Sequence, residues 1–310
     1  MSCKERQARP RRRAAGCSGE RNPQAVLRTH QLGENVSRAL VNGFGYGLVL
    51  LALIVFPLSG CVSGPDLPPK PQPPEPSGTL LQPQLRIGTS PNYVPLAYKD
   101  PVVGLVGVEI DFAKQLGKGL GKSIVFVEIP FPELIQALLE ERIDIIMSGM
   151  SITNERIERV SFTDPYAVIG QMVLVRAKDR SAFPNVQSFS KLTSKIGFVQ
   201  KTTGEMAAQA FFPQAALTPQ LTIDHGIAAL RKGEIEVFIH DAPTVWRIAG
   251  NPNEKELAGL YWPLTKEPLA WAVRKNDEPL RFALNRQLDQ WRLDGSLTRT
   301  LSRWVALRIW

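Results

Sequence analysis

Cysteine is the scarcest informative residue in this sequence. Only Cys3, Cys17 and Cys61 occur among the 310 residues, and none follows Cys61. The part of the chain after Cys61 therefore makes no internal disulfide, and its stability must come from a packed core. An oxidising compartment permits disulfides without requiring them, so the shortage is compatible with export from the cytoplasm.

Cofactor motifs are missing as well. The sequence has no P-loop, no CxxC pair, no HExxH and no GxSxG. We therefore expect no bound metal, no nucleotide cofactor and no catalytic residue of these classes.

An excess of basic charge is confined to one end of the chain. Residues 1–60 carry nine Lys/Arg against three Asp/Glu, whereas the other 250 residues carry 28 against 26. The net charge of +8 thus belongs mainly to the N-terminal segment. A nearly neutral remainder argues against a nucleic-acid partner.

Long hydrophobic runs are also lacking. The single uninterrupted run lies within residues 44–60 and spans about 13 residues, which suits a signal-peptide core better than a membrane span. The small residues Ser59 and Gly60 then precede Cys61, as in a lipobox, where the cysteine receives acyl chains such as palmitate. An uncleaved anchor helix is the alternative. Both place the rest of the protein outside the cytoplasmic membrane.

Proline gathers in the segment after Cys61. Residues 64–83 hold eight prolines, a density that excludes a regular helix or a central strand. We expect an extended tether with a reach on the order of 60 Å. A ligand for a proline-recognition domain is the less favoured alternative.

From residue 85 the sequence alternates between strand and helix patterns. Strands are predicted at 85–90, 123–129 and 143–149, with a helix through residues 110–120 that ends at Gly121 and another starting with Pro132 at its first position. A second unit repeats this order: strands at 194–199, 221–223 and 235–239, a helix at 204–211 and a helix capped by Asp224. A further strand at 269–275 and helices at 278–293 and 296–304 complete the chain. This order predicts an α/β protein with two lobes around a cleft.

Polar side chains gather at the expected carboxyl ends of these strands. Arg156 follows Thr153 in the first turn of a short helix, where the helix dipole disfavours a cation. The conflict is resolved if Arg156 forks onto an anion together with Ser151 and exposed amides. Asp241, at a strand end of the second lobe, can accept an ammonium group. Together they fit a small zwitterion.

Each of these assignments has a simpler alternative. Arg156 could be a solvated helix charge, and Asp241 could cap the helix that follows it. Tyr93 and Phe131 could be ordinary core aromatics. Glu109, with Asp111, is better explained as a first-turn helix residue than as a ligand contact. For the histidines, we expect His240 to be a hydrogen-bonded residue at a strand end and His225 to lie on a helix surface.

Three segments resemble the signatures of the family 3 bacterial extracellular solute-binding proteins. They are "GVEIDFAKQLGKGL" from Gly107, "GMSITNERIERVSFTDPY" from Gly149 and "HDAPTVWRI" from His240, and the resemblance spans residues 85–306. Val108 departs from the larger residue usual in the first signature. The resemblance implies two α/β lobes joined by two crossover strands near residues 166–170 and 265–269, serving an amino-acid ABC importer. The expected organisation is a leader at 1–60, the lipidated Cys61 and tether at 61–84, lobe 1 at 85–168 and 267–310, and lobe 2 at 169–266.

The resemblance also implies roles for individual residues. Arg156 and Ser151 would hold the ligand carboxylate, and the Gly149 carbonyl and Asp241 would hold the ammonium. The remaining contacts carried over are the Gly204 amide with Thr203, the flanking aromatics Tyr93 and Phe131, and the side-chain readers Ser90 and Gln200.

Departures from the family pattern concern ligand specificity. Gln200 stands where some amino-acid binders have lysine, Ser90 where an aspartate can read the ligand side chain, and Leu96 where an aromatic is common. These departures favour a neutral polar amino acid as ligand. The partners expected are this amino acid, an ABC permease and, through the lipid, a membrane, with the protein itself a monomer.

An enzyme on the same scaffold is the competing hypothesis. Periplasmic cyclohexadienyl dehydratases share the fold and act on carboxylated amino-acid precursors, a chemistry that needs a general acid in the cleft. Only Lys201 is a candidate for an extra cleft acid or base. A sensor half of a lytic transglycosylase would need a further catalytic domain. We therefore expect a non-catalytic binding protein.

Overall fold

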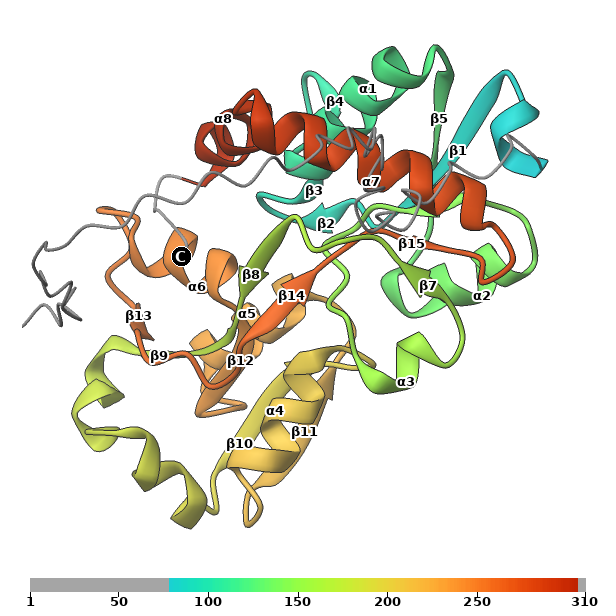
Figure 1. Cartoon of the computed structure of the whole chain (residues 1–310). Coiled ribbons are helices and arrows are strands. Elements are labelled where there is room, and N and C mark those ends of the chain that lie inside the picture. The colour runs from blue at the N-terminus through green and yellow to red at the C-terminus, as the bar shows by residue number, and fades with distance from the viewer. Residues whose placement is uncertain (1–77, 306–310) are drawn as a thin grey trace, which may run out of the picture. The chain divides into compact units, whose positions relative to one another are not determined.

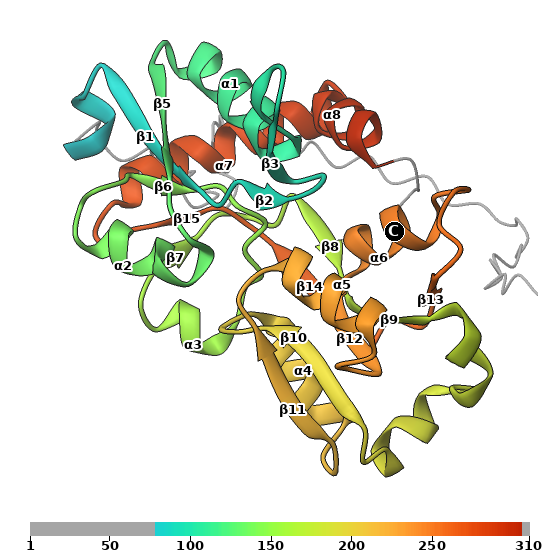
Figure 2. The same cartoon turned by 180° about the vertical axis from the view of Figure 1, so that it is seen from behind.

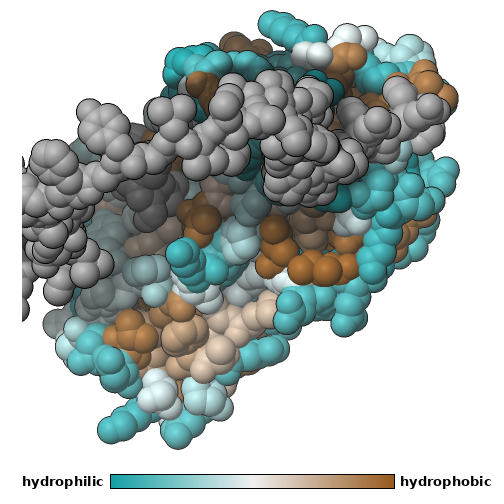
Figure 3. Space-filling view, viewed as in Figure 1, coloured by the Kyte–Doolittle hydropathy of each residue, from teal (hydrophilic) through white to brown (hydrophobic). Residues whose placement is uncertain are grey.

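The computed structural model describes residues 78–305. The predicted leader, the lipidation site at Cys61 and most of the proline-rich tether lie outside the described residues. Within residues 78–305, no helix has both the length and the apolar character needed to cross a bilayer. On the face shown in Figure 3, hydrophobic residues form separate patches among hydrophilic ones.

The first lobe is built on a five-stranded sheet in the order β5-β1-β6-β15-β7 (Figure 1). Strands β5, β1 and β6 run parallel, whereas β15 is antiparallel to both β6 and β7. The bounds are Gln84–Thr89 for β1, Ser123–Glu128 for β5, Ile145–Ile146 for β6, Ser161–Phe162 for β7 and Ala272–Val273 for β15. A small antiparallel sheet of β2 (Asn92–Tyr93), β3 (Ala97–Asp100) and β4 (Gly104–Val106) follows β1.

Three helices of the first lobe, α1, α7 and α8, pack against one another (Figures 1 and 2). Helix α1 ends, as predicted, where Gly121 adopts the left-handed conformation. Beneath these helices Phe112 stacks on Trp291 and meets the edge of Trp271. The helices of this lobe are α1 (Val108–Leu120), η2 (Phe131–Glu133), α2 (Leu134–Leu139), α3 (Asn154–Ile157), α7 (Glu278–Leu293) and α8 (Ser296–Trp304).

The second lobe repeats the arrangement around the sheet β11-β10-β12-β9-β13. Strands β10, β11 and β12 are parallel, and β9 is antiparallel to both β12 and β13. The strands are β9 (Gln171–Arg176), β10 (Lys195–Val199), β11 (Ala216–Gln220), β12 (Val237–Asp241) and β13 (Leu257–Leu260). The helices are η3 (Ala177–Ala182), η4 (Val186–Lys191), α4 (Thr203–Phe211), α5 (Ile223–Lys232) and α6 (Ala242–Ala249).

Two strands link the lobes. The chain leaves the first lobe through β8 (Ala167–Ile169) and returns through β14 (Glu267–Leu269). They pair antiparallel, with Ile169 opposite Glu267. Figure 1 shows this pair between the two main sheets. The crossovers implied by the family resemblance therefore lie where they were expected.

Three local predictions were wrong. Residues 221–223 do not form a strand, because β11 ends at Gln220 and Thr222 already caps α5 by accepting from the amide of His225. Asp224 is consequently in the first turn of α5 rather than at its cap. Pro132 lies inside the short 3₁₀ turn η2, and α2 begins only at Leu134.

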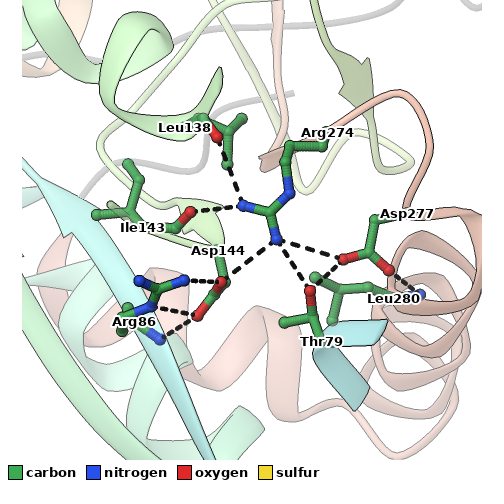
Figure 4. A network of polar contacts seen from close by, with 8 residues as sticks. All are labelled: Thr79, Arg86, Leu138, Ile143, Asp144, Arg274, Asp277 and Leu280. Atoms are coloured by element: carbon green, nitrogen blue, oxygen red, sulfur yellow. Dashed lines mark hydrogen bonds and ion pairs between the residues drawn. The ribbon is translucent and has the colours of Figure 1, made fainter. Parts of the chain in front are cut away.

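The tether also ends earlier than predicted. Gly78–Leu81 form a 3₁₀ turn, η1, that a polar network fastens to the first lobe (Figure 4). Arg274 donates to the hydroxyl of Thr79 at 2.9 Å, and that hydroxyl donates to Asp277. Arg274 also lies 3.3 Å from Asp144, which Arg86 holds from the other side at 2.7 Å. Because these charges are paired and largely buried, the chain enters the first lobe at a defined place.

Candidate functional site

A cavity of about 420 Å³ lies between the two lobes. Its wall takes residues from the strand ends of the first lobe, such as Ser90 and Gly149, and from those of the second, such as Asp241. Eight of the predicted contacts line it: Ser90, Tyr93, Phe131, Gly149, Ser151, Arg156, Thr203 and Asp241. Gln200 and Gly204 are not part of this wall.

Arg156 is presented by the short helix α3. The side chain of Thr153 caps that helix by accepting from the Arg156 amide. The guanidinium lies over the ring of Phe131, 5.4 Å from its centroid, and Nη1 donates to the carbonyl oxygen of Ser151 at 2.8 Å. It forms no ion pair with any residue in 78–305, so its remaining donors can serve an anion in the cavity. Burial lowers the pKa of Arg156, and the nearby carboxylates of Glu267 and Asp241 oppose that shift.

Asp241 faces Arg156 from the second lobe. It occupies the N-cap position of α6, but its side chain makes no capping hydrogen bond. Instead the Tyr93 hydroxyl donates to Oδ2, and the Gln171 amide donates to Oδ1. The side chain of Asp241 therefore does not cap α6.

The surroundings of Asp241 make its charge costly. Burial, together with the negative charge of Glu267, raises the pKa of Asp241 to about 7, while the bonds from Tyr93 and Gln171 and the charge of Arg156 act against this rise. A cation that approaches Asp241 stabilises the ionised form of its carboxyl group. The Tyr93 hydroxyl stays a donor, since burial and Asp241 raise the pKa of Tyr93 well above its ordinary value.

Ser151 has an additional partner that the sequence did not suggest. Its hydroxyl donates to Oε2 of Glu267 at 2.7 Å, and Thr265 donates to Oε1 at 2.6 Å. Glu267 is buried on the returning linker strand β14, with 7% of its surface exposed. The one sequence signal for it is a charged residue opening an otherwise apolar strand, "EPLAWAV". For Ser151 to donate to a ligand, it must turn away from Glu267.

At the start of α4, the amide of Gly204 is not free for a ligand, contrary to the expectation from the sequence. The Gly204 amide donates to the capping oxygen of Thr202 at 3.2 Å, so it is already satisfied within the protein. Thr203 lines the cavity, and its hydroxyl accepts from Gln171 at 3.0 Å. Gln171 was not predicted either, yet it links Thr203 to Asp241.

Position 149, in the cavity wall, requires a glycine. Its φ of 66° is left-handed, and a Cβ there would lie 2.5 Å from Leu96 and 2.9 Å from Tyr93. Tyr93 is both a core residue and a wall residue, with 7% exposure. The two readings considered for that tyrosine are thus compatible.

The two histidines of the second lobe, His240 and His225, lie in different surroundings. His225 is exposed on α5, as expected. His240 lines the cavity, and burial, then the charge of Arg247, lowers its pKa to about 3. Its Nδ1 has no hydrogen-bond partner in the described part of the chain, contrary to the prediction of a bonded residue. Across residues 78–305 no cluster of His, Cys, Asp or Glu side chains is suited to hold a metal ion.

Elsewhere in the wall, the hydroxyl of Ser90 donates to the side-chain oxygen of Asn92 at 3.1 Å. Glu128, at the end of β5, also reaches the wall, but Lys99 pairs with it at 3.1 Å. The negative charge that Glu128 brings to the wall is therefore partly offset by Lys99.

Comparison with known proteins gives consistent matches. The model of the bacterial extracellular solute-binding proteins, family 3, matches residues 85–306. The histidine-binding periplasmic protein of Escherichia coli is 30% identical over 233 residues, covering 71% of this chain and 86% of that protein.

Solved structures agree with this match. A putative ABC-transporter binding component from Wolinella succinogenes, complexed with lysine, is 31% identical with a TM-score of 0.69, covering 74% of this chain and 98% of the other. An ancestral amino acid-binding protein, described as a precursor of cyclohexadienyl dehydratase, is 31% identical with a TM-score of 0.67, covering 72% and 96%.

Proposed function

This chain belongs to the family 3 bacterial extracellular solute-binding proteins, and we propose on that basis that it binds a free amino acid between its lobes and delivers it to an ABC importer. The observation that carries the proposal is the cavity itself. Arg156 and Asp241 line it from opposite lobes. A guanidinium and a carboxylate so placed match the two charges of an amino acid.

The chemistry of the clamp follows from the groups present. Arg156 receives the α-carboxylate on its free donors, and Asp241 receives the ammonium group. Gly149, Ser151 and Thr203 lie beside them in the wall. Charge-assisted hydrogen bonds contribute about 1.5–3 kcal/mol each. Four or five of them, after ordering and closure costs, are enough for the roughly 8 kcal/mol of a micromolar complex.

The protein acts as a carrier rather than as an enzyme. The relatives are named for binding histidine, lysine or amino acids in general. A dehydratase would need a general acid in the cleft. His240, with a pKa lowered to about 3, does not supply one, and Asp241, whose pKa is raised to about 7, is assigned here to the ligand ammonium. Lys201 lies outside the cavity wall.

Calorimetric titration of the purified protein with the twenty amino acids tests the proposal. We expect micromolar or tighter binding of a small subset, with histidine, lysine, arginine and glutamine titrated first. Prephenate and arogenate, added in parallel, should yield no aromatic product. Absence of heat or thermal stabilisation with every amino acid would overturn the function.

We further propose that Cys61 is acylated and holds a monomeric protein at the outer side of a cell membrane. The support is the apolar run followed by Ser59, Gly60 and Cys61. The proline-rich segment that follows would give the lobes reach to a permease.

Acylation of Cys61 predicts a simple labelling result. In cells given an alkyne-tagged fatty acid, the wild-type protein should carry the tag, and the C61S variant should lose it and leave the membrane fraction. The C3S and C17S variants are matched controls and should keep it. A wild-type protein that never takes up the tag would contradict the anchor.

A further inference from the structure

Glu109 is a buried acid that does not line the ligand cavity. It lies in the first turn of α1 with 0% of its surface exposed. No cation pairs with it among the described residues. Burial raises its pKa to about 7, although three hydrogen bonds to it act in the opposite direction. A helix dipole alone does not account for a carboxylate so far from water.

The three donors to Glu109 come from separate parts of the chain. The Gly149 amide donates to Oε1 at 2.7 Å, and the Tyr166 hydroxyl donates to the same oxygen at 2.7 Å. The indole Nε1 of Trp271 donates to Oε2 at 2.9 Å. One carboxylate thereby satisfies three buried donors.

The three donors to Glu109 lie in the cavity wall and next to the two linker strands. Gly149 belongs to the cavity wall. Tyr166 directly precedes β8, through which the chain leaves the first lobe, and Trp271 follows β14, through which it returns. Glu109 is therefore bonded at once to the ligand wall and to the first-lobe end of each linker strand.

We propose that Glu109 is a positioning residue for ligand binding, which fixes the backbone of Gly149 and couples it to both linker strands. The inference rests on the proposed function, because it concerns the affinity of the same cavity. A peptide group is planar, so a hydrogen bond to the Gly149 amide also fixes the preceding carbonyl of Ser148, another wall residue. The left-handed φ of Gly149 leaves this segment dependent on outside contacts for its orientation.

A purely structural role for Glu109 makes a different prediction. If the carboxylate only supported the core, its loss would lower stability and leave affinity unchanged. If it positions Gly149, affinity should fall even in variants that are fully folded. Glutamine has the size of glutamate but presents an N–H₂ group, which cannot accept from one of the three donors. The E109Q variant should therefore disturb the contact without creating a cavity.

The test is the dissociation constant of the full chain for the amino acid among histidine, lysine, arginine and glutamine that the wild type binds most tightly. It is measured by calorimetry well below the unfolding midpoint of each variant. For E109Q we expect at least a tenfold rise. Y166F removes one donor, keeps the ring and changes no wall residue; it should raise the constant about threefold or more.

Asp111 provides the matched control. It lies in the same turn of α1 but accepts from Trp304 at 2.8 Å, on the α8 side of the lobe. D111N should lose some stability and keep the wild-type affinity within twofold. Wild-type affinity in both E109Q and Y166F would overturn the inference, and Y166F alone decides if E109Q does not fold. A wild type that binds no amino acid would instead overturn the proposed function.

Discussion

Replacing Arg156 by alanine is expected to abolish amino-acid binding. The guanidinium is the one cation placed in the cavity wall among residues 78–305, and it has free donors for a carboxylate. Losing two charge-assisted hydrogen bonds of about 1.5–3 kcal/mol each corresponds to at least a 100-fold rise in the dissociation constant. Calorimetry with the best wild-type ligand measures the change.

Two further variants sharpen this experiment. R156K keeps the positive charge but loses the planar fork, so it should recover only part of the affinity. R159A is the matched control, because Arg159 is exposed and, among residues 78–305, its side chain hydrogen-bonds only to Gln136, at 3.3 Å. Its affinity should equal that of the wild type. An R156A protein that binds within a few-fold of the wild type would refute the clamp.

Binding should weaken steeply below neutral pH. The pKa of Asp241 is raised to about 7, and only the ionised carboxylate attracts the ligand ammonium. From this group alone the affinity should therefore fall about 50-fold between pH 7 and pH 5, approaching tenfold for each pH unit well below that value. Because the bound ammonium stabilises the ionised form, ligand binding at pH 7 should release protons, which calorimetry in buffers of different ionisation enthalpy detects.

Controls assign this pH dependence to Asp241. D241N should bind weakly and keep only the weaker pH dependence that Glu109 contributes. Glu109 is the other acid with a pKa of about 7, and its protonated form lacks one acceptor as glutamine does, so E109Q should bind more weakly and keep only the part of the slope that Asp241 supplies. His240 titrates far below this range. A wild-type affinity independent of pH between 5 and 8 would show that Asp241 does not hold the ammonium.

The raised pKa of Asp241 has the opposite pH effect on the stability of the ligand-free protein. The folded-state pKa of Asp241 lies above the ordinary value of an aspartate, so the folded protein binds a proton more tightly than the unfolded chain does. This contribution to stability is present at low pH and is lost as pH rises from about 4 to about 7. Ligand should reverse part of that loss.

The sequence was a good guide to regular elements. Helices α7 and α8 were predicted at the residues where they lie, since their apolar residues recur at helical spacing and Gly295 separates them. The start of α5 was mispredicted because Thr222 and Asp224 are both good capping residues. The choice between them depends on where the preceding strand ends, which β10 decides by pairing with β11.

Of the residues that the sequence predicted for the site, some line the cavity and others do not. Arg156, Ser151 and Gly149 lie in one motif, so their spacing placed them together. Gln200 and Gly204 also adjoin predicted strand and helix ends, but neither lines the cavity. The Gly204 amide donates to the side chain of Thr202. The sequence does not decide this contact, because Thr202 and Thr203 are both good capping residues.

What the sequence determined by itself was local: the alternation of strands and helices, and the cation and anion at strand ends. The tertiary structure alone decided which polar groups meet. Ser151 bonds to Glu267 across 116 residues, Gln171 to Asp241 across 70, and Glu109 to Trp271 across 162. The pKa values near 7 of Asp241 and Glu109 arise there too, because burial removes water from these two carboxylates. Periodicity and spacing record neither the distance between remote side chains nor their access to water, and both set the chemistry of this cavity.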